Sequence, residues 1–200
     1  LFRNSPREHP GVNDAEAEMI EEGEMVVTAN QPIRWDWSDA NIRNIAAFFG
    51  ASFSSTFADN LFVFWMPTFL VQAKGFSPAE MGLFASLPLF GGAIGGLVGG
   101  VLSDVLIAWT GNRRWSRTAV GFTGKFVAAG VMLVAISQSN GYMAAGCFFM
   151  VKFFTDWSQP TVWGTCTDMG GRYSASVFSI INTAGGVGGI TMVLFAGPFL

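Results

Sequence analysis

The 200-residue chain is 50% hydrophobic but only 12% charged, about half the charged share of an average soluble domain. Its 11 basic and 14 acidic side chains give a net charge of −3 without a basic patch, which argues against a nucleic-acid partner. Composition therefore places most of the chain in lipid, with a mean hydropathy of +0.41.

Residues 1–41 form a polar head segment that holds most of the acidic charge. Nine of the 14 acidic residues lie in this part of the chain. The acidic run over residues 14–24 predicts one amphipathic surface helix, capped by Asn13 or Asp14. Residues 28–39 are predicted to be a linker with two tryptophans at the membrane interface, Trp35 and Trp37.

Five apolar segments follow, each of a length that crosses a bilayer core as a helix, which takes about 20 residues. The segments lack the alternation of membrane strands. We therefore predict an all-α polytopic membrane protein in which residues 42–200 form a transmembrane bundle. The predicted spans are residues 42–71, 81–109, 118–137, 142–163 and 173–200.

Basic residues mark the loops on one side of the membrane. The head segment, the first residues of the first span and the loops after the second and fourth spans carry eight of the 11 basic residues, whereas the opposite connections carry only Lys74. Because positive charge favours the cytoplasmic side, we expect the head segment and these loops to be cytoplasmic. The odd number of spans and the start at Leu1 lead us to expect a fragment.

Small residues recur along the second and fifth spans at helical spacing. Such rows let two helices approach closely in lipid. They fit either static packing or a smooth face on which helices rock, and the sequence leaves both open. The second span carries Gly91, Gly92, Gly95, Gly96, Gly99 and Gly100, and the fifth carries Gly185, Gly186, Gly188 and Gly189.

Four charged residues are clear cases of a charge inside a span, away from its ends, where burying a charge is costly and usually indicates function. They are Asp59, Lys125, Lys152 and Asp156. Lys125 falls in the cytoplasmic third of its span, where a lysine either snorkels to the interface or acts within the membrane. Lys152 and Asp156 are one helical turn apart and can pair, which makes them candidates for ion coupling or for a structural ion pair.

Polar side chains form stripes on the first, fourth and fifth spans. In the fourth span the stripe lies beside Pro160, which interrupts the helix. Hydroxyl groups often bond back to their own helix, so each stripe alone is weak evidence. Together the stripes predict a water-filled site for a hydroxylated or anionic solute. Its predicted residues are Ser52, Thr56, Asp59, Asn60, Gln159, Trp163, Asn182 and Thr183.

The loop after the second span, GGVLSDVLIAWTGNRRWSR, resembles the signature cytoplasmic loop of the major facilitator superfamily. A basic residue usual in that loop is absent between residues 105 and 110. The resemblance implies a cytoplasmic gate in which Asp104 bonds to a neighbouring helix in one state and releases it in the other. The matching residues include Gly100, Asp104, Gly111, Arg113 and Arg114.

Three further segments resemble the anion:cation symporter branch of that superfamily: HPGVNDAEAEMIEEGE, FWMPTFLVQAKGFSPAEMGLFASLP and DMGGRYSASVFSIINTAGGVGG. The branch includes carriers of hexuronates, aldonates and other organic anions. The resemblance implies helices 7 to 11 of a twelve-helix fold, with the N-terminal half of the protein as a missing partner. It implies a symporter that moves a sugar acid with a proton or sodium gradient, in a bacterial inner membrane, and places Asn182 on the site.

Two other function classes are weighed against transport. A membrane sensor or assembly subunit would keep the fold and move nothing, using the acidic head segment as its interaction surface. An enzyme is not expected, because the sequence holds no HExxH, no GxSxG and no paired Cys/His ligand set. His9 lies in the polar head, and Cys147 and Cys166 lie in apolar stretches, so we expect no metal and no cofactor beyond the coupling ion.

Overall fold

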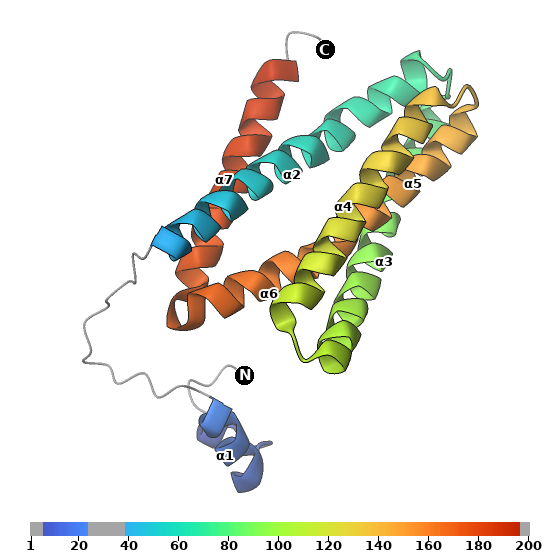
Figure 1. The fold of residues 1–200 in the computed structure, drawn as a ribbon. Helices are drawn as coiled ribbons and strands as arrows, with labels where there is room; N and C mark the ends of the chain where they lie inside the picture. The colour runs from blue at the N-terminus through green and yellow to red at the C-terminus, as the bar shows by residue number, and fades with distance from the viewer. Residues whose placement is uncertain (1–5, 24–38, 197–200) are drawn as a thin grey trace. The chain divides into compact units, whose positions relative to one another are not determined.

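The computed structural model describes residues 6–23 and 39–196, which belong to two separate units, residues 1–38 and residues 39–200 (Figure 1). The first unit contains a short 3-10 helix, η1 (Pro6–Glu8), and one α-helix, α1 (Asp14–Gly23). Asn13 caps α1, since its side-chain oxygen accepts a hydrogen bond of 2.8 Å from the Glu16 N–H. The predicted linker and its two tryptophans lie outside the described residues.

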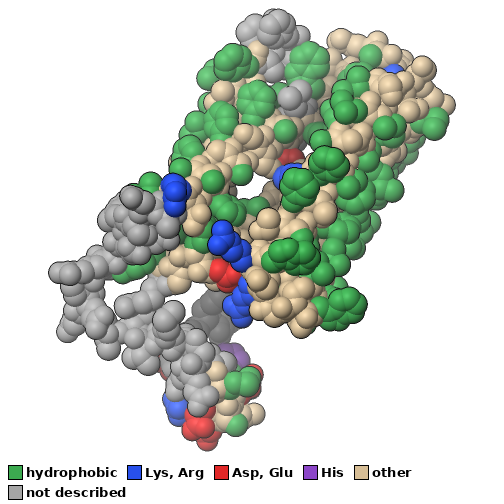
Figure 2. Space-filling view, in the orientation of Figure 1, with side chains coloured by type: hydrophobic (Ala, Val, Ile, Leu, Met, Phe, Trp, Pro, Cys, Tyr) green, Lys and Arg blue, Asp and Glu red, His purple; other side chains and the backbone are tan. Residues whose placement is uncertain are grey.

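The second unit consists of helices and short connections in the part that the structure describes. Its helices begin and end within a few residues of the predicted segments, except that the fourth segment is divided in two. Apolar side chains dominate the face shown in Figure 2, where charged side chains on the helices are few. The helices are α2 (Asp39–Gln72), α3 (Pro78–Thr110), α4 (Arg113–Ser137), α5 (Gly141–Trp157), α6 (Gln159–Gly170), η2 (Gly171–Tyr173) and α7 (Ser174–Ala196).

Three of the described helices, α3, α4 and α7, are long and apolar enough to cross a membrane by length and composition. Helix α2 is longer but carries the polar stripe around Asp59, and the predicted fourth span is split between α5 and α6. The break falls at Ser158, two residues before Pro160, whose ring nitrogen has no hydrogen to donate. The count of five membrane spans therefore stays a prediction.

The two glycine rows of α3 have different neighbours. A Cβ at Gly91, Gly95 or Gly99 would collide with a backbone carbonyl oxygen of α5. At Gly92 it would instead meet the carboxylate of Asp156, while Gly96 has room. One row thus lets the backbones of α3 and α5 approach closely, and the other row begins at a charged group.

We expect Gly95→Ala to lower the melting temperature of the detergent-purified protein, because the added methyl group has no space beside the Phe153 carbonyl. Overpacking of this kind typically costs about 1–3 kcal/mol. Gly82→Ala on the same helix is the matched control, since nothing lies within 4 Å of the position that its Cβ would take. Equal melting temperatures for the two variants would contradict the close packing of α3 on α5.

The ends of α2, α3, α4 and α5 meet in a compact polar and aromatic cluster. Lys74 donates a hydrogen bond of 2.6 Å to the Gln138 carbonyl at the end of α4. Ser77 and Glu80 form the capping box of α3, and the Tyr142 hydroxyl donates to Glu80 at 3.0 Å. This cluster fixes how the four helices enter the bundle, and so helps to set which of their faces meet.

Candidate functional site

The most informative group in the described chain is a charged cluster on α2 and α5. The Lys152 ammonium donates to Asp59 at 3.0 Å and to Asp156 at 2.9 Å. The three side chains are largely buried, with exposed fractions of 16%, 23% and 21% for Lys152, Asp59 and Asp156. Lys152 therefore joins two of the predicted polar stripes, which come from helices far apart in the sequence.

Gly92 of α3 makes room for this cluster. A side chain at that position would overlap a carboxylate oxygen of Asp156 and crowd the Lys152 stem. The absence of a side chain at residue 92 therefore lets α3 cover the ion pair without displacing it. Partial burial strengthens the attraction between the charges, because the surrounding dielectric constant is low.

Lys125 occupies the midpoint of α4, a helix of 25 residues. About 18 Å of helix separates it from either end at 1.5 Å per residue, which is more than a lysine side chain reaches. The ammonium instead donates to the Ser55 hydroxyl of α2 at 2.8 Å. Because α4 begins at Arg113, Lys125 lies nearer the middle of its helix than of the predicted span 118–137, and its position within the membrane stays a prediction.

Thr56 and Asn60 line an open groove between α2 and α7, with a volume of about 420 Å³. The Asn60 amide group donates to the Thr56 carbonyl at 2.9 Å, so its own helix holds it in place. Opposite them lie Gly186 and Gly189 of α7. The rest of the lining is apolar: Phe64, Ile190, Val193 and Leu194.

The other predicted cavity residues lie at several separate places. Ser52 is half-buried where α2 passes Gly185 of α7. Asn182 and Thr183 are exposed on α7, and the Thr183 hydroxyl donates to its own helix. Gln159 begins α6, and the Trp163 ring contacts Phe178 edge-on. None of the interactions found in the described residues links these side chains to Lys152, so their place in one cavity stays a prediction.

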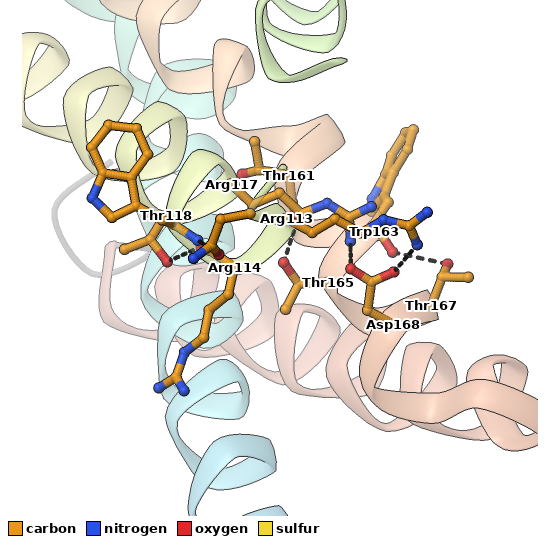
Figure 3. A network of polar contacts seen from close by, with 11 residues as sticks. Arg113, Arg114, Arg117, Thr118, Thr161, Trp163, Thr165, Thr167 and Asp168 are labelled. Carbon is orange, nitrogen blue, oxygen red and sulfur yellow. Dashed lines mark hydrogen bonds and ion pairs between the residues drawn. The ribbon is translucent and has the colours of Figure 1, made fainter. Parts of the chain in front are cut away.

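A second charged group joins α4 to α6 (Figure 3). The side chains of Arg117 and Arg113 converge on Asp168, with Arg117 in direct hydrogen-bond contact and Arg113 at 3.7 Å. Arg117 is the more buried of the two, at 17% exposed against 71%. Its guanidinium group lies over Gly164, where a Cβ would come within 2.6 Å. Arg114 points away from this group (Figure 3).

The signature loop connects α3 to α4, and the structure shows one arrangement of it. Gly111 ends α3 with a left-handed backbone, φ +64°, and donates its N–H to Ile107, which explains the glycine. Asp104 is exposed and makes no hydrogen bond or ion pair with the residues that the structure describes. The acidic partner of Arg113 and Arg117 is Asp168, near the end of α6, which was not among the predicted site residues. Whether Asp104 acts as a gate stays a prediction.

Comparison with known proteins adds several relatives. The "Probable sulfoacetate transporter SauU" of Cupriavidus necator is 33% identical over 132 residues, covering 65% of this chain and 30% of that protein. The "Probable galactarate/D-glucarate transporter GudP" of Bacillus subtilis is 25% identical over 202 residues, covering 96% of this chain and 44% of that protein. The "D-galactonate transporter" of Escherichia coli O6:H1 is 23% identical over 202 residues, covering 96% of this chain and 46% of that protein.

The chain spans less than half the length of these curated relatives. A family model described as Major Facilitator Superfamily matches residues 1–192, which is nearly the whole chain. The apolar helices of this chain agree with the match, since three of the described helices are long and apolar enough to span a membrane. The chain is therefore an all-α integral membrane protein that belongs to the Major Facilitator Superfamily.

Proposed function

We propose that the full-length protein is a secondary active transporter, and not an enzyme, that moves a small organic anion across a bacterial inner membrane by alternating access. The observation that carries this proposal is the placement of Lys152 between Asp59 and Asp156 on α2 and α5, two helices of the predicted transmembrane bundle. Charges inside membrane helices are rare and commonly mark a solute or ion pathway. Relatives named for galactarate, glucarate, galactonate and sulfoacetate support a sugar acid or a similar anion as the solute.

The charged cluster supplies a physical route to ion coupling. Lys152 ties α5 to α2 through Asp59, while Asp156 holds the ammonium in place on its own helix. A proton or sodium ion bound at Asp59 would weaken the tie to α2, and one bound at Asp156 would release Lys152 from its own helix. Either event would shift the balance between two arrangements of the helices. In this proposal helices α2 to α7 are helices 7 to 11 of a twelve-helix fold, with α5 and α6 together forming the tenth. The head segment is then cytoplasmic.

Uptake by the full-length protein in proteoliposomes tests the proposal. We expect a sugar acid to accumulate when an inward proton or sodium gradient is imposed, and not when the gradient is dissipated by an ionophore. The panel should contain hexuronates, aldonates and aldarates. Failure to take up any member under either gradient would contradict the proposal. That result would favour a membrane sensor or assembly subunit with the same fold.

A further inference from the structure

Lys125 is a cation inside the helical bundle whose only hydrogen bond in the described residues is to a neutral group. It lies at the midpoint of α4, and its ammonium donates to the Ser55 hydroxyl at 2.8 Å. Asp59 and Asp156, the two carboxylates whose charges act on this ammonium, are each bonded to Lys152 instead. A serine hydroxyl compensates a buried positive charge much less than a carboxylate does.

The charged side chains that surround Lys125 are those of the charged cluster. Asp59 of α2 and Lys152 and Asp156 of α5 act electrostatically on its ammonium. Ser55 and Asp59 are one turn apart on α2, so the two lysines contact the same face of that helix. Helix α3 contributes the uncharged Gly92 beside Asp156, and α7 carries no ionisable side chain. The four charges sum to zero.

Of the two lysines, Lys125 is the one that the charges favour as the partner of a negatively charged solute group. Lys152 already has two carboxylate partners, so a third anion beside it would be repelled by both. Lys125 can exchange its hydroxyl partner for an acid group and form a stronger, charge-assisted hydrogen bond. Lys125 thus offers one binding position for one acid group, on the side of the cluster formed by α4 and Ser55.

We propose that Lys125 binds the second acid group of a doubly negative solute and so lets the transporter distinguish diacids from monoacids. The inference rests on the proposed function and deepens it. One lysine neutralises one charge, so a carrier of a diacid needs a cation for each end of the solute. Of the two lysines in this group of four charges, Lys125 is the one without a carboxylate bonded to it among the described residues. Galactarate and sulfoacetate, named for two of the relatives, both carry two acid groups.

Galactarate and galactonate form a matched pair of probes, because they differ in one terminal group, a carboxylate against a hydroxymethyl. Both should be titrated against the purified full-length protein by calorimetry, with Lys125→Met and Lys125→Arg measured alongside the wild type. We expect Lys125→Met to weaken galactarate binding by at least about tenfold and galactonate binding by less than about twofold. Lys125→Arg keeps the charge and should keep most of the preference for galactarate.

Ser55→Ala is the matched structural control, since it removes the resting hydrogen bond and leaves the cation in place. Galactarate should bind this variant as tightly as the wild type or more tightly. If Lys125→Met does not fold, Lys125→Gln tests the same loss of charge while still donating to Ser55. A charge-neutral variant that binds both acids as the wild type does, or loses both equally, would overturn the inference. So would a loss of galactarate binding in Ser55→Ala as large as that in Lys125→Met. A wild type that binds neither acid would instead overturn the proposed function, and the inference with it.

Discussion

Replacing Lys152 with methionine is expected to lower the free energy of unfolding by about 3–5 kcal/mol, the usual loss when one partner is removed from a buried ion pair. The change leaves the carboxylates of Asp59 and Asp156 close together without a cation between them. Methionine nearly matches the length of the lysine stem, so packing against Gly92 is kept. Thermal unfolding in detergent measures the effect as a lower melting temperature.

The paired control is Lys152→Met combined with Lys125→Met, Asp59→Asn and Asp156→Asn. Removing all four charges leaves no uncompensated group, and such a replacement is often neutral or stabilising. The quadruple variant should therefore recover most of the lost stability. A Lys152→Met protein that melts at the wild-type temperature would show that the cluster contributes nothing to holding α2 against α5.

Asp156→Asn is expected to reduce gradient-driven uptake by at least about tenfold, the effect of losing one charge-assisted hydrogen bond of this strength. Membrane insertion should be normal, because asparagine has the same shape and Asp59 still neutralises Lys152. Uptake in proteoliposomes measures the first effect, and yield with gel-filtration behaviour measures the second.

Glu18→Gln serves as the control for a lost carboxylate, since Glu18 is exposed on α1, which belongs to the first unit. It should transport as the wild type does. Normal transport by Asp156→Asn would mean that its bond to Lys152 only fixes helix packing. The position of Lys152 would then need another explanation.

Interactions within one helix could be predicted from the sequence because helical spacing alone determines them. The pairing of Lys152 with Asp156 follows from a separation of four residues, and the structure places their polar atoms 2.9 Å apart. The capping of α3 by Ser77 is local in the same way, because Ser77 directly precedes Pro78 at the first position of the helix. The interruption near Pro160 follows from its missing N–H, and the structure locates it at Ser158.

Contacts between helices could not be predicted in the same way. Asp59 is 93 residues from Lys152, and Ser55 is 70 residues from Lys125. Which faces of two helices meet depends on packing along their whole length, and a single sequence does not reveal it. The start of α4 was not predicted either. The helix begins at Arg113, which places Lys125 at its centre.

The glycine rows and the loop arginines show the same limit. Spacing identified both rows on α3, but only the backbone carbonyls of α5 distinguish the packing row from the row that begins beside Asp156. Resemblance to the signature loop pointed to Asp104, whereas the structure pairs Arg117 with Asp168, 51 residues away. Asp168 was among the residues of the resembling segments, so its position before two glycines and Arg172 was the available signal.

Comparing net accumulation with exchange in Asp156→Asn tests the central claim most directly. Exchange of labelled for unlabelled sugar acid needs solute binding and helix movement but no net ion flux, whereas accumulation needs coupling to the gradient. If the Asp59–Lys152–Asp156 cluster couples transport to an ion, the variant will exchange solute and fail to accumulate it under either gradient. Accumulation at the wild-type level would contradict the claim that the cluster couples transport.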